Sequence, residues 1–289
     1  MKASTRQDQP IGVYDSGVGG LSVLKAIQAT LPHESLIYLG DQAKVPYGER
    51  SLPELRELGL GVTRFLLGQG TKLIVIACNT ASAAALQHLR QVYPEVPFVG
   101  MEPAVKPAAE QTQTGKVGVL ATPSTFQGEL YASVVERFAS GVKIYQETCP
   151  GLVSQIEKGY LNTPKTRKIL ERALLPLLDK GVDTLVLGCT HFPFVIPLIQ
   201  EIAAGKARVI DPAPAVARQV ARVLGQQELS NPSTAIGTAR YYTTGNSKKF
   251  QRILFQLIGA QAEVTALEWQ DGELRNPVDS SLRINTNQI

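Results

Sequence analysis

Cysteine is scarce in this sequence, with three residues among 289, and the three lie far apart along the chain. An odd number of dispersed cysteines does not form a disulfide framework, and the sequence has no Cys-x-x-Cys redox pair. Histidine is equally rare, at three residues, so Cys78, Cys189 and His191 offer only three of the about four ligands that a zinc site needs. We therefore expect free thiols, a reducing cytoplasmic location and no metal.

Other absences exclude whole classes of protein. No apolar run approaches the ~18–20 residues of a membrane span, and residues 1–10 lack the apolar core of a signal peptide. The formal charge of +4 is mild and aromatic residues make up 6%. Without a dense basic stripe, nucleic-acid binding is not favoured. A hydrophobic fraction of 44% with 19% charged residues is typical of a globular enzyme.

Two stretches of the sequence resemble each other, IVIACNTAS from Ile74 and LVLGCTHFP from Leu185. Each is an apolar run that suits a strand buried on both faces of a parallel sheet. Each run ends at a cysteine followed by small polar residues. These residues then fall beyond the carboxyl end of the strand, where open α/β sheets bind their ligands.

The likeness between the two stretches is part of a longer repeat. Cys78 and Cys189 lie 111 residues apart, and Gly70 and Gly181 keep the same offset in front of them. A period of about a hundred residues indicates two copies of a domain, since solenoid repeats have periods of about 20–50 residues. We predict a first domain of residues 1–103 plus 212–289 and a second of residues 104–211.

The predicted fold is α/β: two similar domains with mainly parallel sheets flanked by helices, related by a pseudo-twofold axis, with the active site at their interface. The segments after residue 212 have no counterpart in the repeat, so they are expected to pack on the first domain, with a loose polar tail from Asp271. The strands and helices expected elsewhere are strands Ile11–Tyr14, Leu36–Leu39, Val96–Val99, Val117–Ala121, Val142–Gln146, Arg208–Asp211 and Arg240–Thr243, and helices Leu21–Leu31, Leu52–Leu67, Ala81–Tyr93, Lys165–Lys180, Ala215–Leu224 and Ser247–Ile258.

Two thiols at equivalent positions of duplicated domains would face each other across the cleft. Such a pair suits a nearly symmetric reaction, in which a thiolate removes a proton from one face of a carbon and a thiol returns one to the other. An alternative is a Cys–His nucleophile made by Cys189 and His191 for acyl transfer, which would leave Cys78 without a role. Cys149 has no counterpart in the repeat and is interpreted as a buried structural residue.

Further candidates flank the thiols. Asp15 opens a glycine-rich loop that can bind a carboxylate or an amine, and Glu157 stands on a segment where a solvated glutamate is the competing interpretation. The loop Lys44–Arg50 is either a structural turn or a substrate clamp. His191 is interpreted as a residue that assists Cys189. Asn79, Thr80 and Thr190 supply neutral donors and acceptors directly after the thiols.

Four motifs, DSGVGG (15–20), VPYG (45–48), ACNTAS (77–82) and LGCTHFP (187–193), occur in this order. With these motifs the chain resembles the cofactor-independent aspartate/glutamate racemases of bacteria. The residues of the motifs are similar to those of the glutamate racemases within this family. The resemblance implies an isomerase of L- and D-glutamate that needs no cofactor. Aspartate or another amino acid is the alternative substrate. A binding or regulatory protein on the same fold, acting on a DNA enzyme, is the alternative of another class.

The resemblance also implies roles for individual residues. Cys78 would take the Cα proton from D-glutamate with Asp15 as its partner, and Cys189 would take it from L-glutamate with Glu157 and His191. D-Glutamate would serve peptidoglycan synthesis, and hence cell-wall biogenesis and cell shape, in the cytoplasm; the chain would form a homodimer. Substrate contacts are expected at Asp15, Ser16, Pro46, Tyr47, Gly48, Asn79, Thr80, Thr122, Thr190 and His191.

Overall fold

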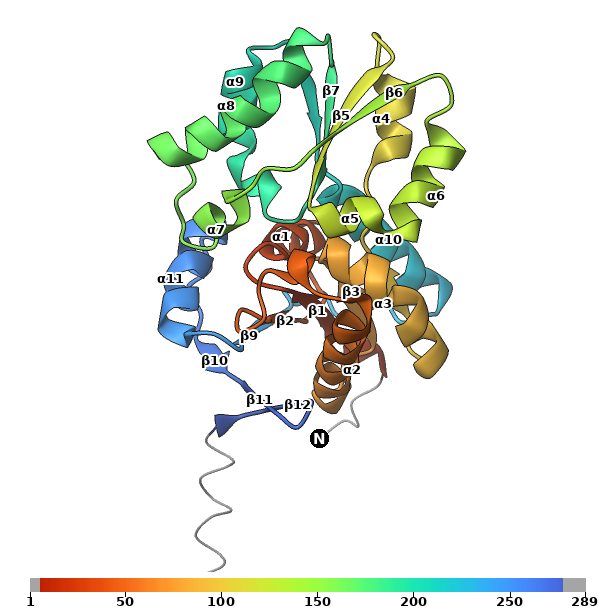
Figure 1. The fold of residues 1–289 in the computed structure, drawn as a ribbon. Helices are drawn as coiled ribbons and strands as arrows, with labels where there is room; N and C mark the ends of the chain where they lie inside the picture. The colour runs from red at the N-terminus through yellow and green to blue at the C-terminus, as the bar shows by residue number, and fades with distance from the viewer. Residues whose placement is uncertain (1–5, 278–289) are drawn as a thin grey trace, which may run out of the picture.

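The computed structural model describes residues 6–277, and two parallel sheets organise the chain (Figure 1). The first sheet has the order β10-β9-β2-β1-β3-β4 and the second the order β6-β5-β7-β8. The strands of the first sheet are β1 (Ile11–Asp15), β2 (Leu36–Gly40), β3 (Leu73–Ile76), β4 (Phe98–Gly100), β9 (Ala239–Thr243) and β10 (Val264–Ala266); those of the second are β5 (Lys116–Ala121), β6 (Lys143–Glu147), β7 (Thr184–Gly188) and β8 (Arg208–Ile210).

The repeat seen in the sequence is also present in the topology. The order β2-β1-β3-β4 in one sheet corresponds to β6-β5-β7-β8 in the other, and every pairing in both sheets is parallel. The central strands are buried along their whole length, as expected for apolar runs covered by helices on both faces. The prediction of mainly parallel sheets flanked by helices is confirmed.

Helices connect successive strands, and several begin at a hydroxyl or amide N-cap, since these side chains satisfy free N–H groups of the first turn. Ser51, Thr122, Thr163 and Asn246 each accept such a bond. The helices are α1 (Leu21–Thr30), α2 (Leu52–Gly68), α3 (Asn79–Val92), α4 (Val105–Gln111), α5 (Pro123–Gln127), α6 (Glu129–Phe138), α7 (Leu152–Ile156), α8 (Pro164–Asp179), α9 (Ile196–Ala203), α10 (Ala213–Gln226) and α11 (Ser247–Ile258), with short 3-10 turns η1 (Arg6–Asp8), η2 (Tyr47–Glu49) and η3 (Phe192–Val195).

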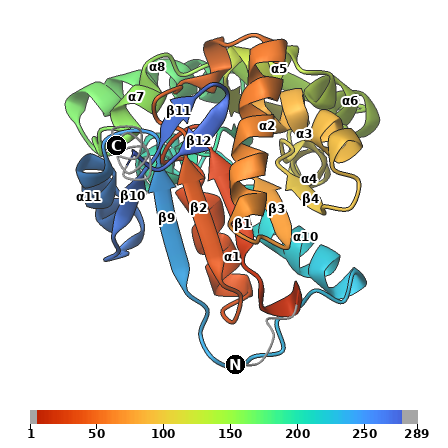
Figure 2. The same ribbon diagram turned by 90° about the horizontal axis from the view of Figure 1, so that it is seen from below.

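The segments after residue 212 return to the first sheet (Figure 2). β9 pairs with β2 and β10 pairs with β9, while α10 packs on α1. The tail expected from Asp271 is not loose at its start: β11 (Glu268–Gln270) and β12 (Glu273–Arg275) form a hairpin, which the Trp269 indole ties to Asp41 over 2.8 Å. The rest of that tail, from residue 278, lies outside the described residues. The division into domains at residues 103 and 211 stays a prediction.

The carboxyl ends of the two sheets point toward each other. Asp15 ends β1 opposite Gly40, and Ala121 ends β5 opposite Gly188. Hydrogen bonds join the facing loops, with Ser22 Oγ donating to the Thr190 carbonyl over 3.0 Å. The polar residues that follow the strands of both sheets therefore meet in one place, between the two halves seen in Figure 1.

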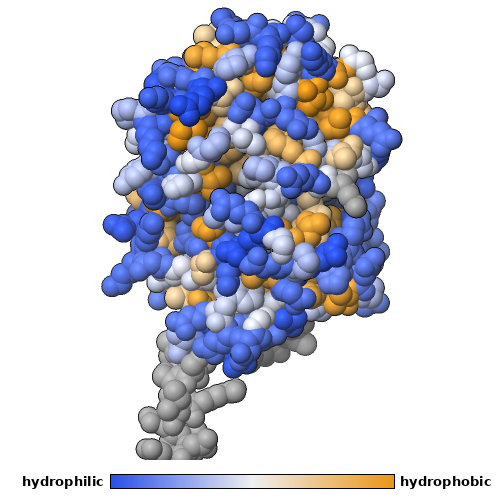
Figure 3. Space-filling view, viewed as in Figure 1, coloured by the Kyte–Doolittle hydropathy of each residue, from blue (hydrophilic) through white to orange (hydrophobic). Residues whose placement is uncertain are grey.

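In residues 6–277, no helix is both long and apolar enough to cross a bilayer. On the face shown in Figure 3, hydrophilic side chains predominate and apolar ones are scattered. Among the described residues, the large apolar side chains that are exposed are scattered along the chain, namely Leu52, Val92, Tyr160, Leu175, Ile236 and Phe255.

Candidate active site

The structure places two free thiols at one small cavity. Cys78 follows β3 and is the N-cap of α3, while Cys189 follows β7. Both are buried, with exposed fractions of 6% and 7%. The cavity between them has a volume of about 30 Å³ and is lined by Ser16, Val45, Pro46, Tyr47, Gly48, Cys78, Asn79, Thr80, Thr122, Val153, Gly188, Cys189, Thr190 and His191.

Cys189 is the thiol with an imidazole beside it. The His191 Nδ1 atom lies 3.7 Å from the sulfur, and its Nε2 atom lies 2.6 Å from Oε1 of Glu157. Burial alone lowers the pKa of His191, but the hydrogen bonds and charges of Cys189 and Glu157 raise this pKa well above its usual value. These contacts favour the protonated ring, and a protonated ring would stabilise negative charge on the adjacent sulfur.

Glu157, at the C-cap of α7, holds that imidazole as an ionised carboxylate. Burial raises the pKa of Glu157, but the hydrogen bonds from His191, Val18 and Gln42 outweigh burial and lower the pKa below its usual value. The Val18 N–H donates to Oε1 over 2.8 Å, and the Gln42 amide donates to Oε2 over 2.7 Å. A relay of polar contacts thus runs from Cys189 through His191 to Glu157. The Glu157 carboxylate at its end is bonded to loops of the first sheet.

The glycines of the DSGVGG loop permit this contact between the two halves. A Cβ atom at Gly17 would lie 2.0 Å from Oε1 of Glu157, and one at Gly19 would lie 2.5 Å from Nδ1 of His191. Any side chain at either position would therefore displace the relay. The glycines of the motif are therefore needed for the close approach of the two loops.

Cys78 has a less polar environment. Its thiol lies 4.0 Å from the Ser16 hydroxyl, and burial, followed by the negative charge of Asp15, raises the pKa of Cys78 to about 12. Asp15 accepts hydrogen bonds from the Gly17 N–H and the Thr190 hydroxyl, each 2.9 Å long. Burial also raises the pKa of Asp15. Asp15 thus acts on Cys78 through its charge, while its hydrogen bonds hold its own loop and the loop that carries Thr190.

Asn79 provides unsatisfied polar groups at the cavity. The residue is 4% exposed, and neither its side-chain nitrogen nor its oxygen has a hydrogen-bond partner in the described chain. Buried polar atoms are almost always paired, and Asn79 is also the first residue of α3, where free N–H groups favour an anion. A carboxylate or ammonium group of a ligand in the cavity would satisfy these atoms.

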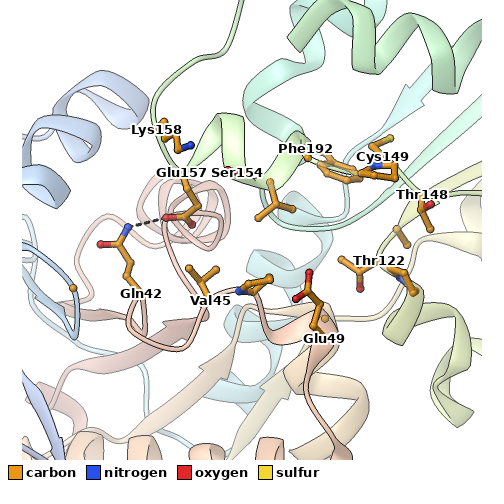
Figure 4. Close-up of a pocket in the computed structure, with 18 of the residues that line it drawn as sticks. Gln42, Val45, Glu49, Thr122, Thr148, Cys149, Ser154, Glu157, Lys158 and Phe192 are labelled. Carbon is orange, nitrogen blue, oxygen red and sulfur yellow. Dashed lines mark hydrogen bonds between the residues drawn. The ribbon is translucent and has the colours of Figure 1, made fainter. Parts of the chain in front are cut away.

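A larger pocket of about 650 Å³ adjoins the thiol cavity, and Figure 4 shows side chains that line it. The two share Val45, Pro46, Gly48, Thr122 and Val153 as walls. Because 30 Å³ is about the volume of one water molecule, an amino acid would reach the thiols only if this shared wall moved. Cys149 lines the outer pocket but not the thiol cavity, and burial raises the pKa of its thiol to about 12.

Most of the residues expected from the sequence therefore line the thiol cavity, and Asp15 and Glu157 lie directly behind it, bonded to Thr190 and His191. Tyr47 contributes its ring, but its hydroxyl donates to Asp41 over 2.7 Å, so it braces its own loop. Among residues 6–277, no group of three or more His, Cys, Asp or Glu side chains is placed to hold a metal ion.

Sequence reasoning missed Gln42, Val18 and Val153. Gln42 stands two residues beyond the carboxyl end of β2, where ligand-binding residues of α/β sheets collect. That rule would have marked the position, although it would not have identified Glu157 as its partner.

Two parallel sheets whose facing edges each bring a buried free thiol to one cavity form an arrangement that suits an isomerase acting by proton transfer. The sequence model of the family described as Asp/Glu/Hydantoin racemase matches residues 18–220, and the chain belongs to this family.

Individual relatives give the same result. The glutamate racemase of Ectopseudomonas mendocina is 51% identical over 255 residues, which are 88% of this chain and 97% of that protein. Among solved structures, a glutamate racemase of Bacillus anthracis matches with a TM-score of 0.83 and 32% identity, over 92% of this chain and 99% of the other. A glutamate racemase of Francisella tularensis in complex with D-glutamate matches with a TM-score of 0.78 and 30% identity, over 90% and 97%.

Proposed function

We propose that this protein is a cofactor-independent glutamate racemase that transfers protons at Cα through Cys78 and Cys189. The observation that carries the proposal is the pair of free thiols at equivalent strand ends of two similar sheets, lining one cavity. The relatives support glutamate as the substrate, since the Ectopseudomonas mendocina protein is named a glutamate racemase and the Francisella tularensis structure contains D-glutamate.

In the direction from L- to D-glutamate, the reaction begins with a thiolate at Cys189, stabilised by the His191 imidazolium 3.7 Å away. The thiolate removes the Cα proton, and the electron pair of the C–H bond delocalises into the substrate carboxylate. Asn79 and the N-terminus of α3 are suited to hold that carboxylate and to stabilise the charge as it grows.

The second step delivers a proton from Cys78 to the opposite face of Cα. Burial and Asp15 raise the pKa of Cys78 to about 12, so this thiol holds its proton at neutral pH until the carbanion accepts it. The product leaves a thiol at Cys189 and a thiolate at Cys78. The starting form returns when one proton moves back, through solvent or through the reverse reaction.

The substrate-binding roles predicted for Ser16, Tyr47, Gly48, Thr80, Thr122 and Thr190 are part of the same proposal. Their support is that all six line the thiol cavity. Thr80 and Thr122 come from opposite sheets and their hydroxyls lie 3.1 Å apart. A substrate that bonds to either hydroxyl would therefore lie where the two halves of the molecule meet.

The family resemblance supplies three further proposals. D-Glutamate produced here would serve peptidoglycan synthesis and thereby cell shape. The enzyme would work in the cytoplasm, which agrees with three free cysteines. It would also form a homodimer, which sedimentation of the purified chain would test directly.

The racemase proposal is tested by circular dichroism of the purified protein with L-glutamate and then with D-glutamate, in deuterated water without added cofactor. Loss of optical activity from both enantiomers, with deuterium appearing at Cα, is the expected result. Decay with aspartate but not with glutamate would change the substrate and keep the two-thiol chemistry. A flat signal with both amino acids would overturn the proposal.

A further inference from the structure

Gln42 lies in the loop after β2, and its side-chain amide joins two distant parts of the chain. Its Nε2 atom donates to Oε2 of Glu157 over 2.7 Å, as Figure 4 shows. Its Oε1 atom accepts a hydrogen bond of 3.2 Å from the hydroxyl of Thr243, the last residue of β9. Because a donor faces one end of the amide and an acceptor the other, the amide has one favourable orientation.

The bond from Gln42 fixes the rotation of the Glu157 carboxylate. Oε1 is already shared by the Val18 N–H and the His191 ring. In residues 6–277, Gln42 is the one donor to Oε2. With that donor removed, the carboxylate could turn about its own axis and carry Oε1 away from His191.

We propose that Gln42 is a positioning residue for the Cys189 half of the site, holding the Glu157 carboxylate so that His191 stays against the thiol. The proposal rests on the proposed racemase activity and extends it to a residue outside the thiol cavity. Gln42 acts through Glu157 and His191, and it does not contact the reacting carbon.

The segment that returns to the first sheet braces this glutamine. The Gly245 N–H donates to the Thr243 hydroxyl over 3.0 Å, which aims that hydroxyl at Gln42. A Cβ atom at Gly245 would lie 2.8 Å from Cβ of Gln42 and 2.9 Å from its Oε1. Even an alanine at residue 245 would therefore push the glutamine side chain out of place, without removing its amide.

Two variants and a control separate positioning from general weakening of the contact between the halves. Gln42→Met keeps the length of the side chain and removes the donor, and Gly245→Ala displaces the intact amide. The control is Gln256→Met. Gln256 is an exposed residue of α11 whose amide donates over 2.7 Å to the carbonyl of Gly159, just beyond Glu157 in sequence. It joins α11 to the segment that carries Glu157 without bonding to Glu157 itself.

The readout is the primary deuterium isotope effect on kcat/KM, measured separately with Cα-deuterated L- and D-glutamate. Slowing the Cys189 step makes its C–H cleavage more rate-limiting, so the isotope effect rises with L-glutamate and falls with D-glutamate. We expect this opposite shift in Gln42→Met and Gly245→Ala, with kcat/KM lowered about 10-fold, the low end for a hydrogen bond to a charged group. The control keeps the wild-type isotope effects.

The outcomes distinguish this proposal from the proposed function. If the wild type racemises glutamate and Gln42→Met has the same rate and isotope effects, the positioning role is overturned. Equal shifts with both enantiomers, or shifts in the control as well, would also overturn it. If the wild type does not racemise glutamate, the activity fails, and the nitrogen-15 resonances of His191 decide the role of Gln42: resonances unchanged in Gln42→Met would refute it.

Discussion

The two thiols occupy equivalent ends of equivalent strands, yet their surroundings differ. Cys189 has an imidazole 3.7 Å from its sulfur and a carboxylate behind that ring. Cys78 has a hydroxyl at 4.0 Å and a pKa that burial and Asp15 raise to about 12. Duplication therefore preserved the position of the thiols, while the groups that control their charge diverged.

This difference bears on the charge of the two thiols. The His191 ring beside Cys189 would stabilise negative charge on that sulfur, whereas burial and the charge of Asp15 raise the pKa of Cys78 and favour a neutral thiol there. In the proposed mechanism, this form takes its proton from L-glutamate. A racemase must work equally from both sides, since its equilibrium constant is one. The asymmetry of the free protein thus concerns which protonation form is present before the substrate binds. It does not make one direction of catalysis faster than the other.

The largest expected effect comes from removing either sulfur. Cys78→Ser and Cys189→Ser should each lower turnover by at least ~10²-fold, the low end of what a positioned acid or base contributes. Because each variant keeps one thiol, Cys78→Ser should still exchange the Cα proton of L-glutamate with solvent deuterium, without inversion, and Cys189→Ser should do so with D-glutamate. Proton NMR in deuterated water measures both rates. Near-normal racemisation in either variant would contradict the two-thiol mechanism.

A smaller effect is expected from the groups that flank the sulfurs, and it should differ between the halves. His191→Asn removes a hydrogen-bonded cation, so kcat/KM should fall about 10- to 100-fold, from the roughly 1.5–3 kcal/mol of a hydrogen bond to a charged group. Ser16→Ala removes a long contact between neutral groups, and the loss should be below about 10-fold. Steady-state rates with both enantiomers test this ranking. Equal losses would show that the two environments are functionally alike.

Elements with strong patterns could be predicted from the sequence. The helix expected at Ser247–Ile258 has those bounds in the structure, because its apolar positions recur at helical spacing. The short helices α7 and α9 were missed, since five to eight residues contain too little periodicity to distinguish a helix from a loop. The strand expected at Val142–Gln146 runs one residue later, as Lys143–Glu147, within the usual uncertainty of element ends.

In the candidate site, too, some features could be predicted from the local sequence and others could not. The two cysteines stand directly after buried strands, so local sequence predicts their place at the sheet edge. The environment of Glu157 depends on Val18 and Gln42, which are 139 and 115 residues away. Nothing in its own segment separates a buried relay carboxylate from a solvated one. The direction of a pKa shift is a property of the assembled site, and only the fold reveals it.

A third expected effect concerns substrate binding on the Cys78 side. Asn79→Ala removes the amide whose atoms are unsatisfied in the buried cavity, and with it a handle for substrate, while both thiols and His191 remain. KM for both enantiomers should rise about 10-fold, the low end of the cost of losing a hydrogen bond to a charged group. Binding of an unreactive glutamate analogue, followed by calorimetry, gives the same quantity without turnover. An unchanged affinity would remove Asn79 from the substrate-binding residues.

The smallest effects should appear in the free energy of unfolding. The two buried carboxyl groups, Glu157 and Asp15, contribute to it with opposite signs. The pKa of Glu157 is lowered by folding, so its contribution to stability is present above its unfolded pKa and is lost as pH falls through the folded value. The raised pKa of His191 adds stability below its unfolded pKa, lost as pH rises through the folded value. Burial raises the pKa of Asp15, so this carboxyl opposes folding above its unfolded pKa, and the cost grows until pH reaches the folded value.

At neutral pH, Glu157→Gln should therefore destabilise the protein and Asp15→Asn should stabilise it, each by on the order of 1 kcal/mol. The amide at residue 15 can still accept from the Gly17 N–H, which leaves the loop in place. Urea midpoints measured from pH 4 to 8 test both variants, and the gain from Asp15→Asn should shrink toward the acid end, where the carboxyl becomes protonated in the unfolded chain as well as in the native protein. If both substitutions destabilise the protein equally at every pH, the two carboxyl groups have the same electrostatic role and the prediction is wrong.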